Sequence, residues 1–124
     1  MVVRDKNILI IDDDSRNTFA LSAVLKSKGF CALSAGGMNE AFEILGANRK
    51  IDVILLDMMM PDMDGIEALE ILKSNEQYRH VPVIAVTAQA MAGDREKCLA
   101  AGADQYVSKP VDVDILLERL SHIV

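Results

Sequence analysis

Short, continuously apolar runs alternate with segments of helical periodicity along the whole chain, and this alternation most constrains the fold. The apolar runs are rich in Val, Ile and Leu and have the length of buried strands. They lie at residues 8–11, 31–34, 53–56, 83–86 and 106–107. Apolar residues recurring every three or four positions predict helices at about 15–28, 38–47, 65–74, 91–101 and 112–123. The pattern therefore predicts strands and helices in strict alternation.

Strands that are apolar on both faces are typical of a parallel sheet covered by helices on each side. Right-handed crossovers then give a doubly wound, three-layer α/β sandwich with the flavodoxin-like strand order 2-1-3-4-5. The 124 residues, 51% of them hydrophobic, suffice for one core and predict one domain over residues 1–124.

Two details of the helices can also be predicted. Ser15 is expected to cap the first helix at its N-terminus, and Gly29 to end it. In the third helix, Ala68, Ile71 and Leu72 are expected to face the core.

Charge and cysteine content narrow the function. A net charge of −6 argues against nucleic-acid binding, which depends on Lys and Arg neutralising phosphates. Cys31 and Cys98 lack metal-site or CxxC spacing, so we expect free, buried thiols in a reducing cytosol. The N-terminus resembles neither a signal peptide nor a membrane span. The sequence therefore predicts a cytoplasmic protein without membrane contact.

Polar residues follow four of the five predicted strands, at the point where each of these strands ends. Asp12 and Asp13 follow the first strand, Asp57 the third, Thr87 the fourth and Lys109 the fifth. Because the carboxyl ends of parallel strands share one edge of the sheet, we expect these five side chains to converge.

Three carboxylates in one crevice need a counter-charge, and Mg²⁺ is commonly held by carboxylates, waters and phosphate oxygens. A carboxylate can also act as a nucleophile and form an aspartyl phosphate. The three peripheral oxygens of that phosphoryl group need partners, which the metal, Lys109 and the Thr87 hydroxyl would supply.

Each residue taken alone also has a structural explanation. Acidic residues after a strand, such as Asp12–Asp14, often belong to turns or helix caps. A Thr at the end of a strand usually has no functional role, and a Lys before Pro in a loop is ordinarily just solvated. The run Met58–Met60 suits loop and core packing better than a metal site, because thioethers prefer soft metals. The joint pattern, rather than any single residue, indicates phosphoryl chemistry.

Four segments resemble the signature segments of response-regulator receiver domains. They are IDDD at 11–14, LLDMMMPDMDG at 55–65, VIAVTA at 83–88 and YVSKP at 106–110. The resemblance spans essentially the whole chain. It implies a phosphoryl-accepting switch of a two-component phosphorelay, a regulatory phosphoacceptor that catalyses only its own phosphorylation and dephosphorylation.

The resemblance also implies roles for individual residues. Asp57 would be the phosphoacceptor, contacted through its phosphoryl group by Thr87 and Lys109. Mg²⁺, with Mn²⁺ as the alternative, would be bound by Asp12, Asp13, Asp57 and the backbone carbonyl of Met59. Family members commonly have a cis peptide at the position of Lys109–Pro110. Met59 and Gln89 occupy variable positions that tune the lifetime of the aspartyl phosphate.

A conformational switch is implied as well. In receivers the Thr at position 87 moves toward the phosphoryl group, and an aromatic residue at the position of Tyr106 turns inward. The surface of the fourth helix, fifth strand and fifth helix is thereby remodelled for a partner. The simpler interpretation of Tyr106 is a partly buried aromatic that only packs.

The expected partners are a histidine kinase or His-containing phosphotransfer domain and a downstream protein target. Little chain follows Pro110 beyond the final helix, so we expect a stand-alone receiver or one excised from a hybrid kinase, as a monomer or weak dimer.

Three alternatives remain at this stage. A phosphatase of the haloacid dehalogenase class would need a second Asp where Met59 stands. A flavodoxin-like cofactor binder would need a Gly, Ser or Thr-rich loop instead of DDDS after the first strand. A degenerate receiver would bind proteins without being phosphorylated.

Overall fold

The computed structural model describes residues 6–47, 50–60, 64–87, 93–109 and 111–123. Strands and helices alternate along the chain as the sequence predicts. The strands are β1 (Asn7–Ile11), β2 (Cys31–Ala35), β3 (Val53–Asp57), β4 (Val83–Thr87) and β5 (Gln105–Ser108). The helices are α1 (Ser15–Ser27), α2 (Met38–Gly46), α3 (Gly65–Ser74), α4 (Asp94–Ala100) and α5 (Val113–Ser121).

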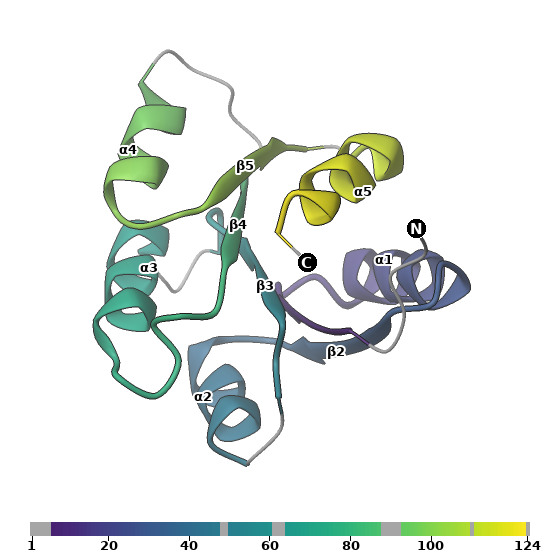
Figure 1. Ribbon diagram of the computed structural model, residues 1–124, viewed down its shortest axis with the longest axis horizontal. Coiled ribbons are helices and arrows are strands. Elements are labelled where there is room, and N and C mark those ends of the chain that lie inside the picture. The colour runs from purple at the N-terminus through teal and green to yellow at the C-terminus, as the bar shows by residue number, and fades with distance from the viewer. Residues whose placement is uncertain (1–5, 48–49, 61–63, 88–92, 110, 124) are drawn as a thin grey trace.

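The strands form one parallel sheet in the order β2-β1-β3-β4-β5, which confirms the predicted flavodoxin-like topology. Figure 1 shows α1 and α5 on one face of this sheet and α2, α3 and α4 on the other. The register aligns Asp57 with Val86 and Thr87 with Ser108. The last residues of β3, β4 and β5 therefore lie at one edge.

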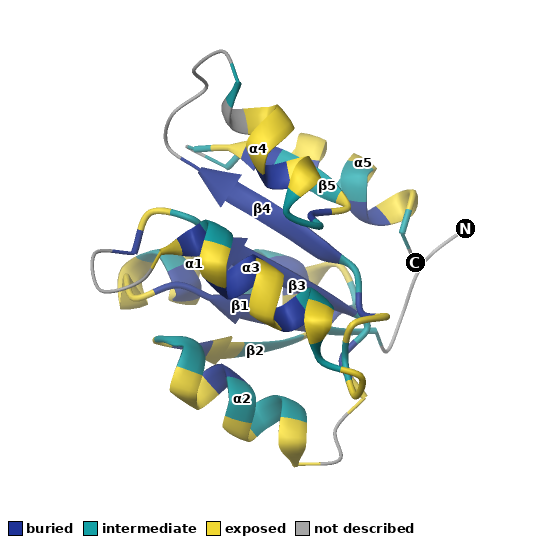
Figure 2. Ribbon diagram, turned by 90° about the vertical axis from the view of Figure 1, so that its left-hand side faces the viewer, coloured by how far each residue is buried: buried dark blue, intermediate teal, exposed yellow. Residues whose placement is uncertain are grey.

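The sheet packs against its helices through two hydrophobic clusters, one on each face, because successive strand residues point to opposite faces. Ile8 and Ile10 pack with α1 and α5, whereas Leu9 and Ile11 pack under the helices of the other face. Figure 2 shows the central strands buried between helices whose outer faces are exposed. Burial of one such aliphatic side chain contributes about 1.5–3 kcal/mol to the free energy of folding. The packed sheet therefore holds the residues at its carboxyl edge in fixed positions.

The ends of α1 explain how the chain turns away from β1. The N-cap is Asp14 and not the predicted Ser15, because the Asp14 carboxylate accepts the backbone N–H groups of Arg16 and Asn17. Gly29 follows the helix with φ of 96°, as the prediction that it ends the helix requires.

Three further predictions about side chains and ends are corrected. Ile71 is 44% exposed and Leu69 is fully buried in its place, because the inward face of α3 runs through Ala68, Leu69 and Leu72. Cys31 is exposed on the edge strand β2, whereas Cys98 is buried as expected. The fourth helix begins at Asp94 after the left-handed Gly93; residues 91 and 92 of the predicted span lie outside the described part.

Candidate functional site

The predicted site residues converge at the carboxyl edge of the sheet. Asp12 follows β1, Asp57 ends β3, Thr87 ends β4, and Lys109 follows β5. Lys109 Nζ lies 3.1 Å from Asp57 Oδ2 and 4.0 Å from Asp12 Oδ2. Parallel pairing thus gathers, at one place, residues that are far apart in the sequence.

Asp12, Asp13 and Asp57 each offer a carboxylate oxygen within 4.8 Å of the other two. Asp12 and Asp57 are each only 4% exposed, whereas Asp13 is exposed. A compact set of hard oxygen donors with one side open to water fits a divalent cation such as Mg²⁺, which retains waters and accepts substrate oxygens. The donor set therefore fits the predicted metal.

The two oxygens of Asp57 have different partners. The backbone N–H of Met59 donates to Oδ1 at 2.9 Å, and Lys109 approaches Oδ2. Burial raises the pKa of the Asp57 carboxyl above its ordinary value, and the charge of Asp12 adds to the rise. The Met59 hydrogen bond and Lys109 act in the opposite direction. Asp57 is consequently a fixed, poorly solvated carboxylate beside the ammonium group of Lys109.

The three consecutive aspartates have three different environments. Asp12 is buried and accepts two hydrogen bonds, from the backbone N–H of Asp14 at 2.9 Å and from Asn17 Nδ2 at 2.6 Å. Asp13 faces solvent, and Asp14 caps α1. The capping explanation is thus correct for Asp14. Sequence reasoning missed Asn17, whose only signal was an amide five positions after Asp12, in the first turn of a helix.

Thr87 is buried beside the same edge, 4% exposed. The backbone N–H of Lys109 donates to the Thr87 carbonyl at 2.7 Å, so the pairing of β4 with β5 extends into the site. A small pocket of about 160 Å³ is lined by Thr87 together with Met58, Met59 and Cys98. Met60 is buried, which agrees with a packing role for part of the methionine run.

Tyr106 lies on β5 and is partly buried, packed against the cluster of the face that carries α2, α3 and α4. It is on the neighbouring strand to Thr87, not at the metal-binding edge. Gln89 and Pro110, for which the sequence suggested a lifetime effect and a cis peptide, lie outside the described residues.

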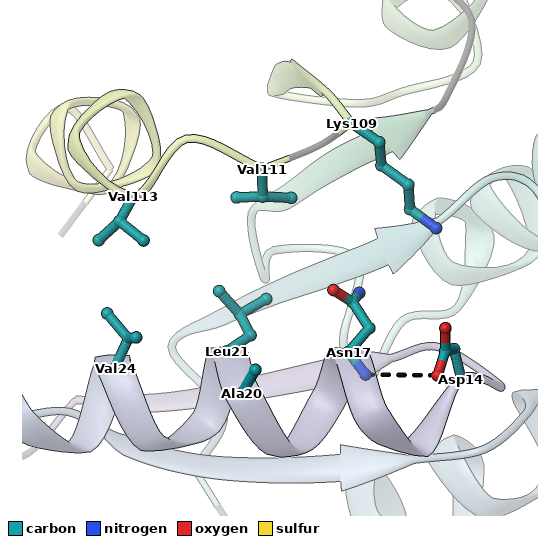
Figure 3. Close-up of a pocket in the computed structure, with 8 residues that line it drawn as sticks. All are labelled: Asp14, Asn17, Ala20, Leu21, Val24, Lys109, Val111 and Val113. Carbon is teal, nitrogen blue, oxygen red and sulfur yellow. Dashed lines mark hydrogen bonds between the residues drawn. The ribbon is translucent and has the colours of Figure 1, made fainter.

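A groove of about 570 Å³ opens beside the site between α1 and the segment that leads into α5. Figure 3 shows its apolar walls, with Leu21 and Val24 on α1 facing Val111 and Val113. Lys109 lines its polar end and also reaches Asp57. One side chain therefore borders both the groove and the carboxylate cluster.

Comparison with known proteins decides the family. The family model of the response regulator receiver domain matches residues 8–121. The chain belongs to this family. Receiver domains are signalling switches of two-component systems, and the match decides against the phosphatase and the flavodoxin-like cofactor binder.

Individual relatives of the receiver cover nearly its whole length. It is 33% identical over 115 residues to the polar-differentiation response regulator DivK of Brucella anthropi, covering 93% of each chain. The receiver domain of sensor histidine kinase PA1611 from Pseudomonas aeruginosa superposes with a TM-score of 0.83 at 33% identity, covering 96% of this chain and 97% of the other. That structure holds a magnesium ion in its active-site cleft.

A third relative is the receiver domain of Ssk1 from Saccharomyces cerevisiae, solved with the histidine phosphotransfer protein Ypd1. The TM-score is 0.87 at 25% identity, and the match covers 99% of this chain and 91% of that one. Among the described residues of the present receiver, no helix has the length and apolarity needed to cross a membrane.

Proposed function

We propose that this receiver accepts a phosphoryl group on Asp57 from a phosphohistidine of a histidine kinase or phosphotransfer protein. The observation that carries the proposal is the pair formed by Asp57 Oδ2 and Lys109 Nζ at 3.1 Å within a cluster of carboxylates. In the transfer, a carboxylate oxygen of Asp57 attacks phosphorus, the phosphorus–nitrogen bond breaks, and the imidazole leaves with the bonding electrons.

A divalent cation, Mg²⁺ or alternatively Mn²⁺, would be bound by the carboxylates of Asp12, Asp13 and Asp57 and by the backbone carbonyl of Met59. When bound, the cation neutralises charge on the phosphoryl oxygens and on the carboxylates. Support comes from the mutual distance of these carboxylates and from the magnesium ion in the cleft of the PA1611 receiver.

Two further side chains, Lys109 and Thr87, would contact the phosphoryl oxygens. Lys109 brings its ammonium group to the oxygen of Asp57 and would pair with a phosphoryl oxygen once the phosphoryl group is attached. The Thr87 hydroxyl would donate a hydrogen bond to another phosphoryl oxygen. The chain would therefore catalyse only its own phosphorylation and dephosphorylation, as a regulatory phosphoacceptor.

The output would be a conformational change. Movement of Thr87 toward the phosphoryl group would draw Tyr106 further inward and remodel the surface of α4, β5 and α5 for a downstream protein. The partial burial of Tyr106, one strand from Thr87, is compatible with this motion. A two-state element biased by new local charge is the usual basis of such switches.

The same proposal includes the biological setting. Residues 1–124 would form one receiver domain in the cytoplasm, a monomer or weak dimer that contacts neither nucleic acid nor membrane. A histidine phosphotransfer partner has precedent in the complex of Ypd1 with the Ssk1 receiver.

Intact-protein mass spectrometry tests the proposal. The chain is incubated with acetyl phosphate, with and without Mg²⁺, in wild-type and Asp57→Asn forms. A Mg²⁺-dependent gain of one phosphoryl group that the variant lacks is the expected result. A folded wild type that gains no mass under any condition would overturn the proposal in favour of a degenerate, constitutively binding receiver.

A further inference from the structure

Both oxygens of the Asp12 carboxylate are already held by the protein. Oδ1 accepts the backbone N–H of Asp14 at 2.9 Å, and Oδ2 accepts Nδ2 of Asn17 at 2.6 Å. Asp12 is only 4% exposed, so water has little access to either oxygen. The plane of this carboxylate is therefore set by Asp14 and Asn17.

The start of α1 places Asn17 for this contact. The Asp14 carboxylate caps the helix by accepting the backbone N–H groups of Arg16 and Asn17 at 3.0 and 3.3 Å. That cap fixes the backbone of residue 17, and the side-chain amide then reaches back over one turn to Asp12. An amide supplies a donor without adding charge to a cluster that already holds three carboxylates.

Asn17 also opposes a competing contact. Lys109 Nζ lies 4.0 Å from the same Oδ2 atom of Asp12 and 3.1 Å from Asp57 Oδ2. Figure 3 shows the side chain of Asn17 rising from α1 toward the end of Lys109. Without the amide, only the backbone N–H of Asp14 holds the Asp12 carboxylate, and its Oδ2 atom can close on Lys109. That ion pair would have to break before Asp12 could bind a cation, and it would draw Lys109 from Asp57.

We propose that Asn17 is a positioning residue that orients Asp12 for metal binding and thereby sets the metal affinity of the site. The inference rests on the metal site of the proposed function and adds to it a residue outside the predicted set. Hydrogen-bond partners of metal ligands typically change metal affinity by about 10- to 100-fold when they are removed.

The test measures Mg²⁺ binding directly, by following backbone amide resonances of the full chain in a Mg²⁺ titration. Asn17→Leu keeps the approximate size of the side chain and removes the donor; Asn17→Ala is the second variant if Leu does not fit. The matched control is Asn39→Leu, an exposed asparagine in α2. Thermal melts in EDTA establish that each variant is folded.

The expected result is an Mg²⁺ dissociation constant about 10- to 100-fold higher for the folded Asn17 variants, and unchanged for Asn39→Leu. At saturating Mg²⁺, the rate of phosphorylation by acetyl phosphate should return to within a few-fold of wild type, because the variants lose metal affinity and keep every group that contacts the phosphoryl oxygens. An unchanged dissociation constant with a lower melting temperature would overturn the inference and leave Asn17 a purely structural residue. Failure of the wild type itself to bind Mg²⁺ would instead overturn the metal site, and this inference with it.

Discussion

The ammonium group of Lys109 lies 3.1 Å from Oδ2 of Asp57, although 52 positions of chain (109 minus 57) separate the two residues. The contact depends on the sheet, because β3 and β5 flank β4 and deliver both residues to its carboxyl edge. Asp57 is nearly inaccessible to solvent, so Lys109 is a main source of compensation for its charge. Lys109 therefore offsets part of the cost of burying the Asp57 charge and lies where phosphoryl chemistry needs a positive group.

Lys109→Met should lower the stability of the metal-free protein by about 1–3 kcal/mol, because it leaves a buried carboxylate without its cation. It should also abolish detectable phosphorylation by acetyl phosphate. Urea unfolding in EDTA and intact mass measure the two effects. In the background of Asp57→Asn, the same substitution should cost distinctly less stability; an equal cost in both backgrounds would contradict the coupling of the pair.

Asp57→Asn should be more stable than wild type at neutral pH without metal. Because the pKa of Asp57 is raised on folding, the folded protein binds the proton of this carboxyl more tightly than the unfolded chain does. The ionised carboxylate is therefore less stable in the folded state. Stability is therefore lost as pH rises through the raised pKa, and regained as pH falls through it. The advantage of the variant should accordingly shrink as pH is lowered from neutral toward the ordinary pKa of an Asp carboxyl, because the carboxyl of the folded wild type becomes protonated. Urea unfolding at several pH values checks this, and a variant less stable at neutral pH would refute it.

Asp13→Asn should remove the stabilisation by Mg²⁺ without weakening the metal-free protein. Asp13 is exposed, so its charge is solvated and repelled by the neighbouring carboxylates until a cation binds. A ligand that binds only the folded state stabilises it in proportion to the logarithm of its concentration over the dissociation constant. Melting temperatures across a Mg²⁺ series should rise for wild type and stay nearly flat for the variant. A lower melting temperature of Asp13→Asn in EDTA would argue against this account.

Leu69→Ala should cost about 2–5 kcal/mol of stability, because Leu69 is fully buried on the inward face of α3. Ile71→Ala, on the same helix at 44% exposure, should cost far less and serves as the matched control. Urea unfolding measures both, and equal losses would mean that the inward face of α3 is assigned incorrectly.

The fold and the convergence of the site residues could be predicted from sequence because both depend on strand ends. Once Asp57 and Thr87 end apolar strands in a parallel sheet, their proximity follows from topology. The contact of Asn17 with Asp12 could not be predicted in this way, because it depends on one rotamer and on which residue caps α1.

The wrong predictions have equally local causes. Ser15 and Asp14 are both good N-caps, and only the path of the chain out of β1 selects Asp14. Ile71 and Leu69 both fit the apolar periodicity of a helix that packs on one face. Only the rotation of α3 against the sheet decides which of the two is buried. Cys31 is exposed because β2 is an edge strand, a property of the assembled sheet that its own sequence does not encode.

The unequal exposure of the two thiols gives this tryptophan-free protein a chemical probe of its own motion. Cys31 is exposed in the folded state, whereas Cys98 is a buried residue of α4 and lines the same pocket as Thr87. With Cys31 replaced by Ser, alkylation at Cys98 would report how often α4 lifts from the core. The rate of Cys98 alkylation before and after phosphorylation would measure the proposed movement of the output surface.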